Sequence, residues 1–168
     1  MQENGKTRMP RKNYWKYNMH KLWLFLHLVG MVVWVGGMFF MLHVLHPSLQ
    51  ALDGPQRPKL VLAVQGKFFK MVSVSLALIW GSGLAMLGTA ISNGLKPWPI
   101  GWHMMVTLAL VMTVLFLYIR LALFPQVQRV FASGEGGQLA PLMKKIRTLM
   151  MVNMGLGFLV IAAAIFGR

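Results

Sequence analysis

Residues 22–45 read LWLFLHLVGMVVWVGGMFFMLHVL, an apolar run without Asp, Glu, Lys or Arg. A helix rises about 1.5 Å per residue and the hydrocarbon core of a bilayer is about 30 Å thick, so a helix of this length crosses it. Similar runs occupy residues 71–91, 102–124 and 149–166. The sequence therefore predicts an all-α membrane protein with four transmembrane helices. Short connections favour an up-down-up-down bundle, with both termini on one side of the membrane.

The composition supports a membrane protein over a soluble one. Of the 168 residues, 57% are hydrophobic and 12% are charged, and 17 Lys and Arg face 3 Asp and Glu. An ordinary soluble domain is about a quarter charged. The apolar content excludes a disordered polycation. The basic residues lie between the apolar runs instead of along one groove or helix face, which argues against a soluble nucleic-acid module. The chain has no Cys, which excludes disulfides and thiolate chemistry.

The segments outside the runs are strongly basic. We expect residues 1–21 to form a basic segment at the membrane surface, and residues 22–168 to form the transmembrane domain. The connections 46–70 and 125–147 each contain an amphipathic stretch, and we expect both to extend helices beyond the same membrane face. The positive-inside rule does not decide the orientation, because each side carries eight Lys and Arg; the dense cluster before the first span favours cytoplasmic termini. The second side holds Arg57, Lys59, Lys67, Lys70, Arg129, Lys144, Lys145 and Arg147.

Histidines inside the predicted spans are functional candidates, because polar groups in hydrocarbon are costly. His103 begins the third span, which runs in the same direction as the first. Two imidazoles from different helices, with small residues leaving a slot between them, are what axial ligation of a haem iron needs. We therefore expect His27 and His103 to bind haem b, with Trp34, Gly30 and Gly37 shaping the pocket. At 100° per residue, one stripe of the first span holds His27, Gly30, Met31, Trp34, Met38 and Met41, bordered by Gly37.

A simpler interpretation of these histidines remains open. In it, His27 donates a hydrogen bond to a carbonyl inside the bundle and His103 is an interfacial residue. Asn153 and the serines Ser73, Ser75 and Ser82 are then interhelical hydrogen bonders.

A second candidate site involves copper. His43 and His46 are three residues apart at the far end of the first span, and neutral imidazoles suit copper and zinc. Two ligands do not complete a site. The 15 methionines could contribute thioethers, which suit Cu(I), but methionine is also an ordinary filler of apolar cores. No catalytic triad, paired carboxylates, phosphate-binding loop or H-E-x-x-H motif is present, so hydrolytic and phosphoryl chemistry are not expected.

Several short motifs resemble the CopD-like family of small four-span bacterial membrane proteins. They begin with His27-Leu-Val-Gly-Met-Val-Val-Trp34-Val-Gly-Gly-Met-Phe-Phe40 and continue with Arg57, Lys67-Phe-Phe, Gly81-Ser-Gly83, Trp102-His103-Met-Met, and the C-terminal stretch from Ile146-Arg147 through Asn153-Met-Gly-Leu-Gly157 to Gly167-Arg168. The likeness covers residues 21–168. The first of these motifs is also similar, more distantly, to the HemJ-type protoporphyrinogen oxidases.

The resemblance implies a multi-pass protein of the bacterial cytoplasmic (inner) membrane. The CopD-like group implies copper resistance or uptake, and the HemJ-type group implies b-type haem and redox chemistry on a porphyrinogen. In the HemJ-type pattern a Lys follows the third-span His, where this chain has Met104 and Met105, and an Arg ends the first span, where this chain has His43. These departures argue against porphyrinogen oxidation and leave haem binding open.

Three functional hypotheses follow. The first is a haem b protein that transfers electrons within the membrane, with a quinone or another redox protein as partner; if it is an enzyme, it is an oxidoreductase. The second is a copper-transport or copper-resistance protein that uses His and Met ligands. The third is a structural subunit without a cofactor. Membrane lipids are expected partners in each, a homo-oligomer is compatible with all three, and nucleic acid is not expected.

Overall fold

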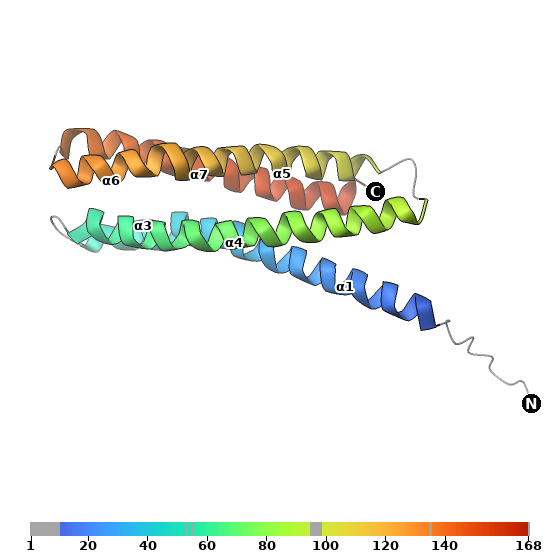
Figure 1. Cartoon of the computed structure of the whole chain (residues 1–168). Helices are drawn as coiled ribbons and strands as arrows, with labels where there is room; N and C mark the ends of the chain where they lie inside the picture. The colour runs from blue at the N-terminus through green and yellow to red at the C-terminus, as the bar shows by residue number, and fades with distance from the viewer. Residues whose placement is uncertain (1–10, 53, 55, 95–98, 135, 168) are drawn as a thin grey trace, which may run out of the picture.

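The computed structural model describes residues 11–52, 54, 56–94, 99–134 and 136–167 (Figure 1). Within them all regular structure is helical. About half of the basic segment predicted at 1–21 lies outside the described residues, as do Lys96, Arg168 and all three acidic residues of the chain, Glu3, Asp53 and Glu135.

The first helical rod begins at α1 (Arg11–Met31) and continues through a π-helical turn (Val32–Gly36), α2 (Gly37–Phe40), a second π-helical turn (Met41–Leu45), α3 (His46–Ser48) and a 3₁₀ turn (Leu49–Ala51). The second rod is α4 (Gln56–Ser92). The third consists of α5 (Ile100–Tyr118), a π-helical turn (Ile119–Leu123) and α6 (Phe124–Ser133). The fourth is α7 (Gly136–Phe166).

These four rods are antiparallel to their chain neighbours, and the start of α1 and the end of α7 lie at the same end of the molecule (Figure 1). Four helices among the described residues are long and apolar enough to cross a membrane, at Tyr17–Ala51, Gln56–Ser92, Ile100–Ser133 and Gly137–Phe166. The predicted all-α, up-down-up-down bundle of four transmembrane helices is confirmed.

The rods are longer than a bilayer requires. Their candidate membrane-spanning parts contain 35, 37, 34 and 30 residues, whereas a span needs about 20. In the second, third and fourth rods the excess lies at the end where α3 turns into α4 and α6 turns into α7, and in the first rod it is shared between both ends. Both connections predicted as helical extensions are therefore helical and lie at one end of the bundle. We call this the long end of the bundle.

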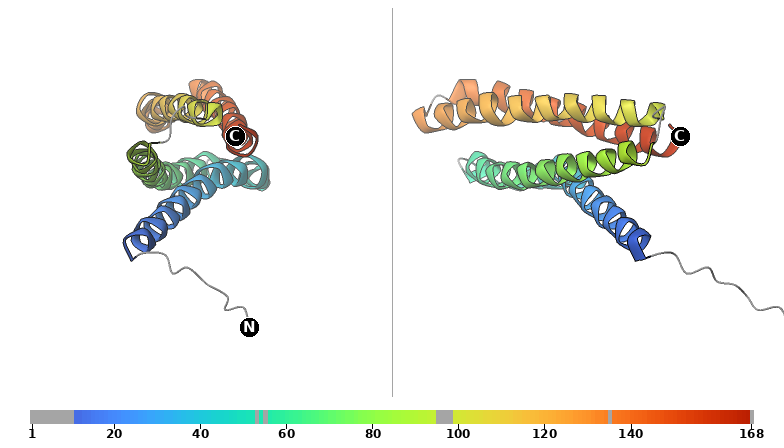
Figure 2. Two further views of the ribbon diagram at one scale, coloured as in Figure 1. Left: turned by 90° about the vertical axis from the view of Figure 1, so that its right-hand side faces the viewer. Right: turned by 45° about the vertical axis from the view of Figure 1, so that its right-hand side comes forward.

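The bundle consists of two helical hairpins. α1 packs along α4, and α5 packs along α7. Figure 2 shows the N-terminal part of α1 leaning away from the second hairpin. The first rod therefore contacts the second hairpin through the half that begins at the π-helical turn Val32–Gly36, which packs on α7.

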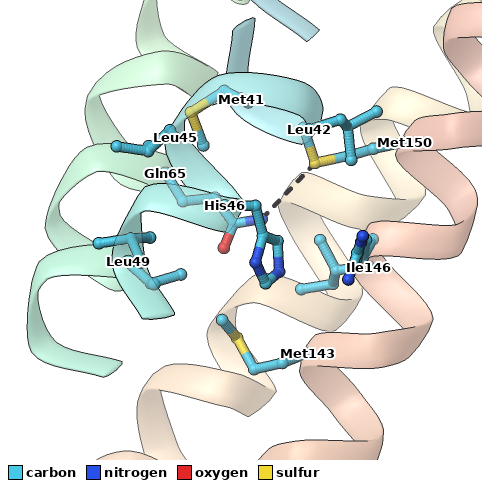
Figure 3. A pocket seen from close by; sticks show the side chains of 11 residues that line it. Met41, Leu42, Leu45, His46, Leu49, Gln65, Met143, Ile146 and Met150 are labelled. Carbon is cyan, nitrogen blue, oxygen red and sulfur yellow. Dashed lines mark hydrogen bonds between the residues drawn. The ribbon is translucent and has the colours of Figure 1, made fainter. Parts of the chain in front are cut away.

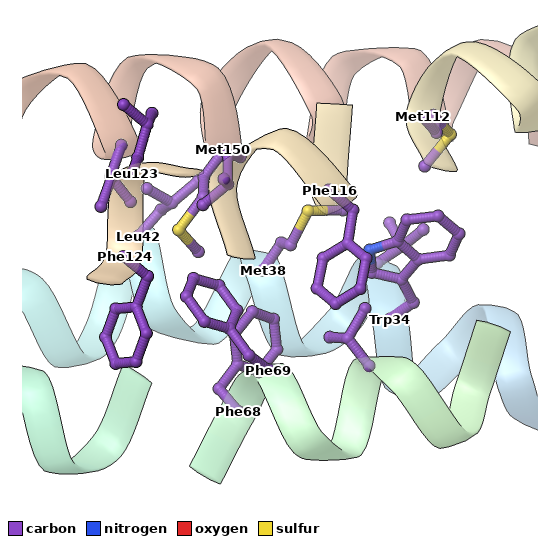
Figure 4. Close-up of a cluster of buried hydrophobic side chains, with 14 of the residues drawn as sticks. Trp34, Met38, Leu42, Phe68, Phe69, Met112, Phe116, Leu123, Phe124 and Met150 are labelled. Carbon is purple, nitrogen blue, oxygen red and sulfur yellow. The ribbon is translucent and has the colours of Figure 1, made fainter. Parts of the chain in front are cut away.

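Aromatic side chains from three rods hold the hairpins together (Figure 4). The Trp34 ring, only 1% exposed, meets Phe116 edge-on with centroids 6.1 Å apart. Phe69 meets both Phe116, at 5.9 Å, and Phe124, at 5.1 Å, in the same manner. Edge-to-face pairs contribute about 0.5–1.5 kcal/mol each beyond burial. The stripe predicted from the first-span periodicity faces this core, because Gly30, Trp34 and Met38 are buried.

Glycines allow the closest approaches between rods. At Gly101 the N–H donates to the Gly167 carbonyl at 2.9 Å, tying the start of α5 to the end of α7. A Cβ at Gly101 would lie 2.6 Å from that carbonyl oxygen and 2.7 Å from that of Ala163. These are backbone atoms, which cannot rotate away, so this helix contact requires glycine.

Gly101→Ala is accordingly expected to lower the free energy of unfolding by about 1–3 kcal/mol, the usual cost of overpacking. The measurement is a denaturant titration of the purified protein in detergent, followed by circular dichroism. Gly155→Ala is the matched control, because a Cβ there meets nothing within 4 Å. Equal stability of both variants would contradict the close contact.

Candidate functional site

Polar side chains gather at two places in the bundle, one around His27 and the other at the long end. At the first, His27 Nδ1 lies 3.1 Å from the Ile79 carbonyl oxygen and 3.1 Å from Ser82 Oγ, both on α4. A carbonyl can only accept, so Nδ1 carries the proton and Nε2 has the lone pair. Ser82 Oγ in turn donates to the Leu78 carbonyl. This is the carbonyl hydrogen bond that the simpler interpretation of His27 expected.

The predicted haem ligands belong to different hairpins. His27 is turned towards α4, whereas His103 is exposed on the first turn of α5, which packs on α7. Their pairing through a haem iron stays a prediction.

The residues expected to shape the haem pocket are engaged in packing. A Cβ at Gly30 would lie 2.7 Å from Ile79 Cγ1, and one at Gly37 would lie 2.6 Å from Phe68 Cε2. The spaces beside these glycines are therefore filled by α4 side chains. Trp34 is buried in the aromatic core.

At the long end His43 and His46 have different surroundings. The His43 ring is exposed, stacks on Phe39 at 4.6 Å, and places Nδ1 3.3 Å from the Phe39 carbonyl oxygen of its own helix. His46 is half-buried and lines a cavity of about 30 Å³. The π-helical turn Met41–Leu45 precedes His46, and its wider winding changes the face on which following residues lie.

This cavity is rich in soft donors. Figure 3 shows the His46 imidazole between Met143 on one side and Gln65 with Met150 on the other. Gln65 is 4% exposed; its Nε2 donates to Met150 Sδ at 3.8 Å, while its Oε1 has no hydrogen-bond partner among the described residues. The lining residues are Met41, Leu42, Leu45, His46, Leu49, Val61, Gln65, Met143, Ile146, Arg147 and Met150.

A second carboxamide–thioether pair lies nearer the aromatic core. Asn153, 2% exposed, donates from Nδ2 to Met38 Sδ at 3.8 Å, and its Oδ1 has no partner within the described part of the chain. Asn153 thus bridges α7 and the first rod, as predicted for an interhelical hydrogen bonder. Both carboxamides use a sulfur as a weak acceptor and leave a carbonyl oxygen orphaned.

Sequence reasoning did not single out Gln65. A signal was present, because Val61, Leu62, Phe68 and Phe69 lie three or four residues away and form an apolar helix face around it. A polar residue on such a face points into the bundle. The cavity itself joins residues from three rods, which helical periodicity does not reveal.

Among the described residues no three His, Asp or Glu side chains lie together. A metal site at the cavity therefore depends on thioether and carboxamide ligands around a single imidazole. Those donors favour a soft, singly charged ion over Zn²⁺ or a hard cation.

The sequence profile of copper resistance protein D (CopD) matches residues 62–166. The chain belongs to the CopD family. The matched segment contains Gln65, Met143 and Met150 of the cavity, whereas His46 and Met41 precede it. No curated protein and no solved structure gives a significant match. The membrane-spanning bundle and the family together show a CopD-family membrane protein.

The side-chain oxygen Oδ1 of Asn153, which has no hydrogen-bond partner among the described residues, leads to a prediction about stability. A buried polar atom without a partner costs about 1–3 kcal/mol, so Asn153→Leu, of similar shape, is expected to leave the unfolding free energy unchanged or to raise it. Asn153→Asp should lower it, because it buries a charge in the bundle. Denaturant titration in detergent measures both. A clear loss of stability in Asn153→Leu would show that Oδ1 has a partner in the membrane.

Proposed function

We propose that this CopD-family chain binds a single Cu(I) ion as cargo in the cavity at the long end, and that it acts in copper handling in the bacterial cytoplasmic membrane. The observation that carries the proposal is the donor set of His46, Met41, Met143 and Met150 around one cavity. Thioethers and imidazole are the ligands that Cu(I) prefers when thiolates are absent. Gln65 adds an orphaned carbonyl oxygen at the same place.

The size of the cavity supports a single ion. A water molecule needs about 10–15 Å³ of such space, and the cavity offers about 30 Å³. One ion therefore fits, and a haem or an organic substrate does not. The family description as a copper resistance protein agrees with an ion as cargo.

Charge at the cavity favours a monovalent ion. Arg147 lines the cavity, with its side chain exposed. Repulsion between its guanidinium and a bound cation doubles when the cation carries two charges instead of one. The arginine therefore opposes Cu²⁺ and Zn²⁺ more than Cu(I), in the same direction as the thioether ligands.

Neighbouring residues provide matched variants for the copper proposal. His46→Ala and Met150→Leu should each weaken Cu(I) binding about tenfold or more, a loss of at least about 1.4 kcal/mol. His43→Ala and Met151→Leu should leave the affinity unchanged, because His43 packs on Phe39 and Met151 is exposed.

The measurement is an anaerobic titration of the purified protein against a coloured Cu(I) chelator, with one ion per chain expected. The proposal fails if the wild-type protein takes no Cu(I) from the chelator. It also fails if His43→Ala and His46→Ala lose equal affinity for Cu(I). That result would indicate that the two histidines bind the ion together at the surface.

A specific observation also favours haem b as a second candidate. A histidine that ligates a metal usually donates its other ring N–H to a carbonyl, which fixes the ring, and His27 makes this hydrogen bond to Ile79. Bound haem would supply one-electron redox chemistry, with a quinone or a redox protein as its partner. His27 would ligate the iron, and Ser82 would fix the orientation of the His27 ring. In the packing described here, Ile79 and Phe68 must withdraw from Gly30 and Gly37 to make room.

The haem candidate predicts a reduced-minus-oxidised spectrum with a Soret band after expression with sufficient haem. His27→Ala should abolish the band, and Ser82→Ala should retain it with haem bound about 10–100-fold more weakly. His20→Ala, at an exposed position of α1, is the control. A preparation without a Soret band removes this candidate, and an unchanged spectrum in His103→Ala removes His103 as a ligand.

A further inference from the structure

Neither candidate function uses the basic groove between α6 and α7 at the long end. The groove is open to the surface, has a volume of about 540 Å³ and receives the exposed side chains of Arg129 from α6 and Lys145 from α7, with Gln126 and Gln138 beside them. Leu142 and Val130 form an apolar part of its lining. Two cations, two amides and an apolar floor from facing helices match a ligand with an anionic head and an apolar tail.

The chain has few acidic residues to balance this charge. The long end carries eight Lys and Arg, and the only acidic residues in its two connections are Asp53 and Glu135. The counter-charge must therefore come largely from outside the chain. Juxtamembrane basic residues gain about 1 kcal/mol each from an anionic membrane surface.

Depth along the helices places the near end of the groove at the outer edge of the lipid headgroups. Twenty residues from Trp102 carry the third rod across a core of about 30 Å, to about residue 121. The groove begins at Gln126, about 7.5 Å further along the axis, at the outer limit of a headgroup layer about 5–7 Å thick on each side. Long Arg and Lys side chains reach back from there to the phosphates. Lys145 marks the same boundary, because its Nζ donates to the Tyr118 hydroxyl at 3.1 Å and Tyr is typical of the interface.

We propose that this groove binds the phosphate headgroup of an anionic phospholipid. Arg129 and Lys145 contact the phosphate from opposite walls. Gln126 and Gln138 donate hydrogen bonds to headgroup oxygens. The acyl chains pack against Leu142 and extend towards the hydrocarbon core. The Tyr118 hydroxyl positions Lys145 at the groove without adding charge.

The experiment measures binding of phosphatidylglycerol and of phosphatidylcholine to the full-length protein in a zwitterionic detergent, by native mass spectrometry. Phosphatidylglycerol should bind more tightly. The double variant Arg129→Gln, Lys145→Gln should lose about tenfold or more of this affinity, as expected for two basic contacts. Lys59→Gln, Lys67→Gln removes the same charge from exposed positions of α4 at the same end and should lose little.

Two further variants test geometry and folding. Tyr118→Phe keeps every charge and should weaken phosphatidylglycerol binding several-fold, since it releases Lys145. Arg129→Lys, Lys145→Arg should retain binding if the variants fold, which circular dichroism checks. If the two double glutamine variants lost equal affinity for phosphatidylglycerol, binding would depend on diffuse surface charge and not on this groove, and the proposal would fail. Equal binding of both lipids, or displacement of the lipid by a modest excess of inorganic phosphate, would overturn it as well.

Discussion

The absence of water in the hydrocarbon core is the constraint on which this structure depends. Every backbone N–H and C=O must be paired within the segment, so the spans are helical from end to end. The three described π-helical turns keep this pairing, because they change the winding without opening the helix. Buried side-chain polar groups are few among the described residues as a result, namely Gln65, Ser75, Ser82 and Asn153.

Because lipid tails are as apolar as leucine, packing quality must hold the hairpins together instead of the hydrophobic effect. Three rods achieve this with edge-to-face aromatic contacts around Phe69. A glycine completes this interface, since Gly157 of α7 admits Val35 of the first rod, while Gly101 admits the backbone at Gly167 within the second hairpin. The N-terminal part of α1 makes no comparable contact with the second hairpin and leans outward (Figure 2). The cavity at the long end lies where the first rod, α4 and α7 meet.

The sequence predicts a feature of the structure correctly when that feature depends on residues close together in the chain. Hydropathy and length depend on the local chain alone, and the four spans were predictable for that reason. The stripe through Trp34 and Met38 depends on a 100° step and also survived, although Trp34 lies in the π-helical turn Val32–Gly36. The helix faces on which His43 and His46 lie were not predictable. A π-helical turn precedes His46, and no residue in the sequence indicates that turn. Gln65 was predictable from its apolar neighbours.

The sequence by itself determined that the chain folds in a lipid bilayer, how many spans it has, their antiparallel order and which face of the first span enters the bundle. These follow from hydrophobicity and helix geometry, which act over one or a few turns. Only the tertiary structure decided which neighbour each buried polar group meets: α4 for His27, Met150 for Gln65, Met38 for Asn153. Periodicity states which face of a helix is buried, whereas the partner depends on the pairing, tilt and axial shift of helices distant in the sequence.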